Sequence, residues 1–517
     1  MSRRKILGDI STALRGGAFV LLSSLLISMS SLNAADSSKS STSSNSGGSY
    51  SSGPSESENE FENYPFKKAQ GSIPAEQVCG IRLKKNKMIL LSYDHEYSEE
   101  QLKDDENFSD TDFFKKYPKL LSVELSEMDM SDEILENLQA YLPNDLKMLI
   151  IDSCKISKKN GYTLLSDLIE RHSSLISLRV RMYSTNASQS EQIADVLSRL
   201  KKLKYLGVGF GEVDNKTLGN LAECLQQSSN NLKDLSLSWM EIANGEDKSE
   251  EDNNNNNEED ASNGANGLVE ALQKVAPRLQ SLELAFLKLP EKSVIDWFGS
   301  LEKCKELKNL TIYVGNMRNY VKAVRNDSAE TLGTAVGGMK HLEKLDISYM
   351  NVGGDFIKPF ADYLKNNPKL SILNISGNPI DVDGASTLAN SLKETGALQV
   401  FMANDCAMEN QTFSELIKFF DTSALTSMYL KNNKIQEGIK QVPFKNMTSL
   451  QVVDLSNNSM TGEDIAYIAE NSPDNLQAVN CSGNSGLNEM SKLERQDLRD
   501  KLENLKLNGL KTAFFGI

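Results

Sequence analysis

The chain has 517 residues and a formal net charge of −15, with 71 acidic against 56 basic residues. This length allows several compact domains or one elongated array. The acidic balance argues against a general nucleic-acid binder, which needs a basic surface, and the three histidines (His95, His172 and His341) lie too far apart in sequence for a histidine metal site.

Residues 1–35 have the three-part plan of a secretory signal peptide. A basic start is followed by an apolar stretch from Ala18 to Leu32 and by the small residues Ala34 and Ala35. The letters SRRKIL also resemble the twin-arginine export motif of bacteria. We therefore predict a secreted, periplasmic or cell-surface protein with no membrane insertion after signal cleavage. An uncleaved membrane anchor is the alternative.

Residues 36–64 are rich in Ser and Gly and have almost no apolar side chains. Such a segment cannot bury enough surface to offset its ordering entropy, so we predict a disordered linker. Residues 65–119 are predicted to form an N-terminal cap region, with the apolar run from Met88 to Tyr93 as its edge strand.

A repeating frame, L-x-x-L-x-L-x-x-N-x-L, occupies residues 120–487. Neighbouring starts are mostly 25 to 29 residues apart, with two longer spacings of 47 and 35. This is the period of a leucine-rich repeat, in which each unit buries its apolar face only against its neighbours. The starts are Leu120, Leu146, Leu175, Leu203, Leu232, Leu279, Leu307, Leu342, Leu370, Leu398, Leu425, Leu450 and Leu476.

The asparagine of the frame lies where the chain turns away from the strand, and its amide can satisfy backbone groups that the turn leaves unpaired. Asn378, Asn433, Asn458 and Asn484 stand at this position. Cys154 and Cys406 replace it, and Cys481 falls on an inward strand position. We interpret these three cysteines as small buried residues rather than catalytic ones.

The second half of most repeats is predicted to be helical. In the segment 213–229, for example, Leu218, Leu221 and Leu225 share one helical face. A strand followed by a helix every 28 or 29 residues resembles the ribonuclease-inhibitor subclass of leucine-rich repeats. That resemblance implies an α/β solenoid with a parallel concave sheet and helices on the convex side. Pro443 predicts a local departure, because it stands where a helix would run.

Two further segments differ from the repeats. Residues 243–266 are acidic, Asn-rich and without an apolar pattern, which predicts a disordered surface insert. This insert is either a sticky patch for a basic partner or a neutral insertion in a tolerant loop. Residues 488–517 are predicted to form a C-terminal cap helix and tail, with a final strand in the letters KTAFFGI.

The strand side chains that do not point inward should line the concave sheet, about 5 Å apart from strand to strand. On this basis we predict a contiguous aromatic row with two arginines at its rim. Exposed aromatic and arginine side chains are typical of protein-binding hot spots. The alternative is that the row packs beneath a loop of the chain itself. The predicted protein-binding residues are Phe210, Trp239, Phe286, Tyr313, Tyr349, Arg179 and Arg181.

No catalytic motif accompanies this surface. The sequence has no G-x-S-x-G, HExxH or P-loop motif and no cysteine and histidine paired with an orienting acid. We therefore expect a non-enzymatic protein that binds another protein, without cofactor, metal or small-molecule substrate. The alternatives are a host-directed effector, a regulator similar to the Ran GTPase-activating proteins, or an anchored surface or adhesive protein.

Overall fold

The computed structural model describes residues 67–68, 77–84, 87–92, 96–101, 114–156, 160–238, 240–242, 256–285, 291–313, 326–350, 357, 360–361, 363–422, 424–507 and 509–515. The predicted signal peptide, the predicted linker and residues 243–255 of the predicted insert lie outside these ranges. The chain divides into two compact units, Met1–Val123 and Glu124–Ile517.

The first unit contains an antiparallel arrangement in which β3 (Lys87–Ser92) pairs with both β2 (Val78–Lys84) and β4 (Glu96–Gln101). The short β1 (Lys67–Lys68) pairs in parallel with β4. Alternate residues of β2 are buried, as expected for a strand with one apolar face. Because β3 lies between two partners, the prediction that the run from Met88 forms an edge strand is wrong.

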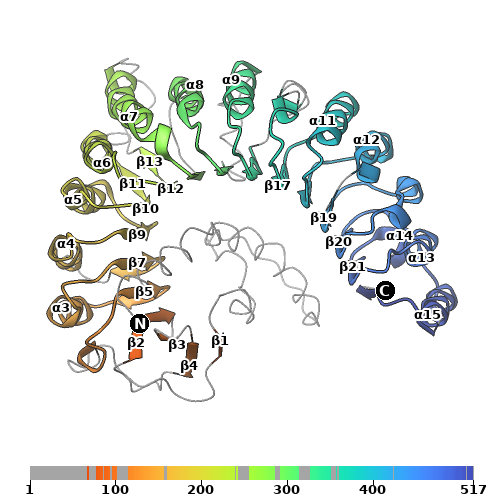
Figure 1. Ribbon diagram of the computed structural model, residues 1–517, viewed down its shortest axis with the longest axis horizontal. Coiled ribbons are helices and arrows are strands. Elements are labelled where there is room, and N and C mark those ends of the chain that lie inside the picture. Colours follow the sequence, from red (N-terminus) through yellow and green to blue (C-terminus); the bar gives the residue numbers. More distant parts are fainter. Residues whose placement is uncertain are drawn as a thin grey trace, which may run out of the picture. The chain divides into compact units, whose positions relative to one another are not determined.

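The second unit is built on a ladder of parallel strands in chain order, one per repeat. The strands line the inner side of this unit and the helices cover the outer side (Figure 1). The strands of this ladder are β7 (Met148–Asp152), β9 (Ser177–Met182), β10 (Tyr205–Phe210), β12 (Asp234–Ser238), β14 (Ser281–Ala285), β15 (Asn309–Tyr313), β16 (Lys344–Asp346), β17 (Ile372–Asn374), β18 (Val400–Met402), β19 (Ser427–Tyr429), β20 (Val452–Asp454), β21 (Ala478–Asn480) and β22 (Ala513–Phe515).

The register of the ladder brings the frame leucines of successive repeats together. Leu149 pairs with Leu178, which pairs with Leu206, and the same position continues as Leu345 and Leu373 further along. These leucines are at most 3% exposed. Each contributes roughly 1.5–3 kcal/mol of hydrophobic stabilisation that depends on the next repeat being in place. The expected α/β leucine-rich repeat solenoid is therefore confirmed.

The helices follow the strands and bury their 3.6-residue apolar stripes, such as Leu218, Leu221 and Leu225 in α6. Several start at side-chain caps, for example Asn186 with Gln189 and Thr461 with Asp464. The helices of this unit are α3 (Asp132–Tyr141), α4 (Gly161–Arg171), α5 (Ala187–Leu197), α6 (Asn215–Ser228), α7 (Asn256–Val275), α8 (Glu291–Ser300), α9 (Asn326–Gly337), α11 (Val382–Thr395), α12 (Asn410–Leu416), α13 (Gly462–Glu470), α14 (Ser485–Asn488) and α15 (Lys492–Leu507).

The repeat that contains Pro443 has no α-helix between its strands. Two 3-10 turns, Glu437–Gln441 and Phe444–Asn446, connect β19 to β20. The cause is the missing backbone N–H of proline, which cannot continue an α-helix. Among the described helices, none is both long and apolar enough to cross a bilayer.

One boundary predicted from the sequence is wrong. Residues 256–266, which were expected to belong to a disordered insert, form the first part of α7. The later turns of α7 bury Leu268 and Leu272 and so anchor the helix.

The C-terminal segment adds two elements to the array. Helix α15 buries Leu498 and Leu502 and packs near α13. Strand β22 pairs in parallel with β21 and extends the ladder by one strand. Together they cover apolar surface that the last repeat would otherwise expose.

Candidate protein-binding surface

The predicted aromatic row is not formed as expected. Phe210 is 0% exposed, so the prediction that it lies on the open face is wrong. Strand β10 continues through Phe210, and side chains two residues apart lie on the same side of a strand. Phe210 therefore points into the hydrophobic core, on the same side of the strand as Leu206 and Val208. Trp239 and Phe286 lie outside the described residues.

Two of the predicted aromatics do meet. The rings of Tyr313 and Tyr349 have centroids 5.7 Å apart and an interplanar angle of 75°, an edge-to-face arrangement. Both side chains are partly exposed. Tyr313 is the last residue of β15. Because its neighbour Ile312 points into the hydrophobic core, Tyr313 points to the opposite side of the strand, which is the inner, concave face of the sheet. We call Tyr313 and Tyr349 the tyrosine pair.

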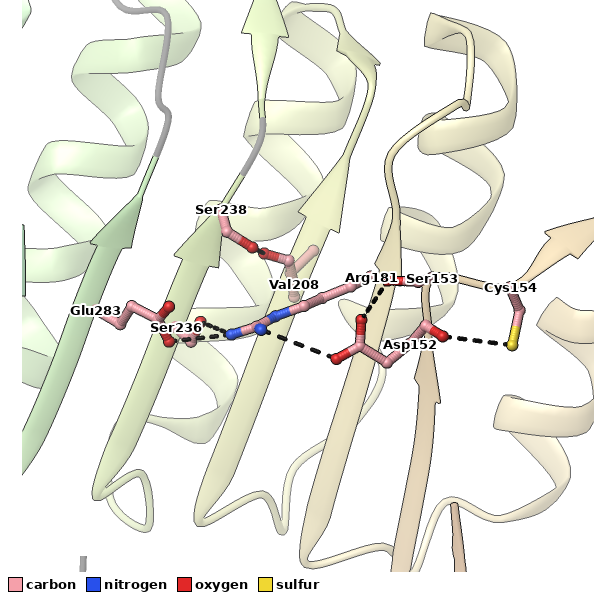
Figure 2. A network of polar contacts seen from close by, with 8 residues as sticks. All are labelled: Asp152, Ser153, Cys154, Arg181, Val208, Ser236, Ser238 and Glu283. Carbon is pink, nitrogen blue, oxygen red and sulfur yellow. Dashed lines mark hydrogen bonds and ion pairs between the residues drawn. The ribbon is translucent and has the colours of Figure 1, made fainter. Parts of the chain in front are cut away.

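The predicted rim arginines lie in β9, and Arg181 already has partners within the chain. Its Nη2 atom donates to Ser236 Oγ at 2.9 Å and to Glu283 Oε2 at 3.0 Å, and its Nη1 lies 3.8 Å from Asp152 Oδ2. Figure 2 shows the guanidinium reaching from β9 toward Ser236 of β12 and Glu283 of β14. We call Asp152, Arg181, Ser236 and Glu283 the Arg181 network.

Two glycines of β10 make room for the arginines. A Cβ atom on Gly209 would stand 3.2 Å from Arg181 Cγ and 2.8 Å from Ser238 Oγ. A Cβ atom on Gly207 would stand 3.0 Å from Arg179 Cγ. Both contacts are tighter than ordinary side-chain packing. The absence of side chains on β10 therefore lets the arginines of β9 lie across this strand.

The network changes the acidity of its members. Burial alone would raise the pKa of the Glu283 carboxyl, but Arg181 and then Arg179 hold that pKa below its ordinary value. Burial lowers the pKa of Arg179, and the positive charge of Arg181 lowers it further. The carboxylates of Glu283 and Asp152 thus offset the repulsion between the guanidinium groups of Arg179 and Arg181, which lie close together on the sheet.

Tyr349 has an unusual backbone conformation. Its φ is +52°, a left-handed conformation that costs a bulky residue energy. Its ring occupies the space above Gly377, where a Cβ would come within 2.3 Å of Tyr349 Cδ1. Its hydroxyl donates to Asp405 Oδ2 at 2.7 Å. Burial, and then this hydrogen bond to Asp405, raises the pKa of Tyr349.

A left-handed residue recurs in this position in the C-terminal repeats. Glycine, Asn and Asp tolerate this conformation far better than Tyr. The recurrence was not predicted from the sequence, although the spacing of about one repeat between Gly, Asn and Asp residues could have revealed it. The positions are Tyr349, Gly377, Asp405, Asn432, Asn457 and Gly483.

The polar residues of the C-terminal strands satisfy the backbone. Asp454 Oδ1 accepts from Ser456 N at 2.9 Å, and Asn374 Oδ1 accepts from Ser376 N at 3.1 Å. The same turn recurs at Asp346 with Ser348 and at Asn480 with Ser482. These side chains satisfy backbone N–H groups at the strand ends, so most of the polar atoms on this half of the sheet are already hydrogen-bonded.

The frame asparagines work as predicted. Asn433 donates to Ala403 O at 2.9 Å and to Leu430 O at 3.0 Å, and its Oδ1 accepts from the backbone N–H groups of Cys406 and Met408. It thereby joins two consecutive repeats. We call Asn378, Asn433, Asn458 and Asn484, which make equivalent bonds, the asparagine ladder.

The thiols give no support to catalysis. Cys154, Cys406 and Cys481 are buried, and burial raises the pKa of Cys154 to about 11 and that of Cys406 to about 12. A nucleophilic cysteine needs the opposite shift. Within the described ranges, no three His, Cys, Asp or Glu side chains gather in a way that could hold a metal ion.

The family model that matches this chain agrees with the repeat assignment. A family model described as Leucine Rich repeat matches residues 366–389 and 446–469. Among solved structures, an internalin (inlF) from Listeria monocytogenes str. 4b F2365 is similar, with 18% identity and a TM-score of 0.41 over 71% of this chain and 81% of the internalin. A TLR13–ssRNA13 complex is similar with 15% identity and a TM-score of 0.36, covering 73% of this chain and 58% of TLR13.

Proposed function

We propose that this leucine-rich repeat protein binds a protein partner through the inner face of its sheet and has no catalytic activity of its own. The observation that carries the proposal is the tyrosine pair. Two partly exposed aromatic rings meet on a sheet whose other polar side chains are largely engaged with the backbone or with each other. Aromatic side chains of this kind dominate the binding energy of protein interfaces.

The Arg181 network refines the predicted role of the rim arginines. Because Arg181 is paired with Glu283 and Asp152, it offers a partner less free positive charge than the sequence suggested. Arg181 therefore supports the shape of the N-terminal half of the face, and contact with a partner there would have to add to an existing network. Arg179 keeps its proposed place in the surface beside it.

We further propose export to the cell surface, the periplasm or the medium, on the basis of the signal-like residues 1–35. The alternation of a strand and a helix in most repeats favours the ribonuclease-inhibitor-like subclass, and the repeat with two 3-10 turns departs from it. An anchored adhesive protein is the second candidate. The N-terminal sequence of the mature protein separates the two, because an intact Met1 would favour the anchor.

The binding proposal is tested by crosslinking the full-length protein to its neighbours in its native setting. We expect Tyr313→Ser combined with Tyr349→Asn to abolish the captured partner, because asparagine tolerates the left-handed backbone of Tyr349 and the fold is kept. The matched control is Tyr467→Ala in α13 on the outer side. Equal capture by both variants would refute binding through the tyrosine pair.

A further inference from the structure

Tyr349 of the tyrosine pair lies against the side-chain carboxyl group of Asp405. Asp405 is partly exposed and accepts hydrogen bonds from Tyr349 Oη at 2.7 Å and from Asn432 Nδ2. Both donors are neutral, so they orient the carboxylate without neutralising it. Among the described residues, Asp405 forms no ion pair. A carboxylate has about four acceptor positions, so room remains for a further donor.

The two rings stand nearly at right angles, at 75°, and the hydroxyl group of Tyr349 lies on this carboxyl group. Aromatic faces attract cations through the negative potential of the ring, and perpendicular aromatic walls combined with an acid form the setting in which ammonium groups are bound. We infer that Tyr313, Tyr349 and Asp405 form a subsite that receives a lysine or arginine side chain of the protein partner. This inference rests on the proposed function and names the chemistry of the partner.

The strained backbone of Tyr349 supports a binding role. Equivalent positions in other repeats hold Gly377, Asn432 and Gly483, which adopt a positive φ at little cost, and in the first repeats Glu127 and Ser153. A tyrosine at this position lowers the stability of the fold. In this strained backbone conformation its ring lies over Gly377 and its hydroxyl group donates to Asp405. Strain of this kind concentrates at binding and catalytic sites, where a side chain has to be held ready.

A second acidic side chain, Asp346, is buried and accepts hydrogen bonds from Ser348 and Asn374. The pKa of Tyr313 is raised by burial and then by the charge of Asp346, which places that carboxylate near the first ring. Asp346 is also close to the ammonium group of Lys344, since Asp346 counteracts the effect of burial on the pKa of Lys344. Asp346 is therefore partly compensated, and Asp405 is the principal acceptor for a cation.

The test uses the full-length protein and hexalysine as the probe, with hexa(acetyl-lysine) as its uncharged twin. We expect hexalysine to bind and the acetylated peptide to bind at least about tenfold more weakly, because acetylation removes the cation–π and ion-pair contributions. Asp405→Asn removes the negative charge, keeps one of the two hydrogen-bond acceptors and has a side chain that tolerates the left-handed backbone, and it should weaken hexalysine binding by about tenfold. Tyr349→Asn should weaken binding by a similar factor, whereas Tyr349→Phe should keep most of it.

The matched control for general acidity is Glu463→Gln, which removes one exposed negative charge from α13 on the outer side. It should leave hexalysine binding unchanged. Equal losses for Asp405→Asn and Glu463→Gln, equal binding of the two peptides, or no binding of hexalysine would each overturn the inference. A partner captured through the tyrosine pair in spite of such a result would leave the proposed function standing, so the two failures are distinguishable.

Discussion

Between β7 and β14 the inner face of the sheet carries long charged side chains. Between β16 and β21 the equivalent position carries a short Asp or Asn side chain on four strands, and Met402 and Tyr429 on β18 and β19. In the first region Arg181 crosses a strand of glycines to reach Glu283. In the second region Asp346, Asn374, Asp454 and Asn480 each accept a bond from the serine two residues later, and the asparagine ladder joins the repeats. The same parallel ladder is thus supported by long-range ion pairs in one half and by local backbone bonds in the other.

This difference predicts how each half fails. Ion pairs on a surface contribute modestly and depend on pH and salt, whereas buried side-chain bonds to the backbone are costly to remove under any condition. The N-terminal half should therefore respond to pH and ionic strength more than the C-terminal half. Four substitutions break or sharpen the comparison.

The largest effect is expected from Asn433→Ala. It removes two donated bonds and leaves the buried N–H groups of Cys406 and Met408 without their acceptor. We expect a loss of about 3 kcal/mol in the free energy of unfolding, measured by urea denaturation. Cys406→Ala, which removes only weak S–H bonds, should cost about 1 kcal/mol. The exposed Asn475→Ala is the control, and a loss as large as that of Asn433→Ala would contradict the interpretation.

Removing the centre of the Arg181 network should cost less. We expect Arg181→Met to lower the free energy of unfolding by about 2 kcal/mol, because Glu283 and Asp152 lose their cation while partly buried. The lowered pKa of Glu283 implies that its contribution is fully present above pH 4.5 and is lost as the pH falls below that value.

A double-mutant cycle with Glu283→Gln isolates this pair. We expect a coupling of about 1 kcal/mol at low salt that decreases with ionic strength. The exposed pair Arg199 and Glu170 serves as control and should show a coupling below about 0.5 kcal/mol. A network coupling no larger than this control would show that Arg181 is held by packing alone.

Asp234→Asn should stabilise the protein at high pH. Burial raises the pKa of Asp234 from 3.8 to about 7, and Lys233 only partly opposes this. Between these values the folded chain keeps a proton that the unfolded chain has lost, so stability falls as the pH rises through this window. The asparagine variant should gain about 1–2 kcal/mol over the wild type at pH 8 and little at pH 4, measured by urea midpoints. An equal difference at both pH values would rule out the titration of Asp234 as the cause.

The smallest effect is expected from Gly209→Ala. The new Cβ would stand 3.1 Å from the backbone oxygen of Ser238 and would push Arg181 off its path. We expect a loss of about 1 kcal/mol, together with a smaller coupling between Arg181 and Glu283. Gly219→Ala in α6, where the added Cβ meets nothing within 4 Å, should instead stabilise the protein by about 0.5–1 kcal/mol. Loss of stability in both variants would remove the special role of β10.

The repeat spacing and the apolar frame of the sequence determined the solenoid, because a buried leucine on every repeat has to meet its equivalent on the next one. The asparagine ladder and the buried frame cysteines were predictable for the same reason, since the frame fixes which backbone groups each turn leaves unpaired. These are local patterns that repeat, so a single sequence is sufficient to read them.

The tertiary structure decided the composition of the inner face. Phe210 points into the core because β10 continues through it and keeps it on the same side of the strand as Leu206 and Val208. Arg181 found Glu283 from a strand more than 100 positions away in sequence. The positive φ of Tyr349 aimed its ring at Asp405 two repeats further on. Contacts between residues this far apart in sequence depend on the register of the strands and on where a neighbouring strand carries glycine. The repeat pattern of the sequence does not specify either of these features.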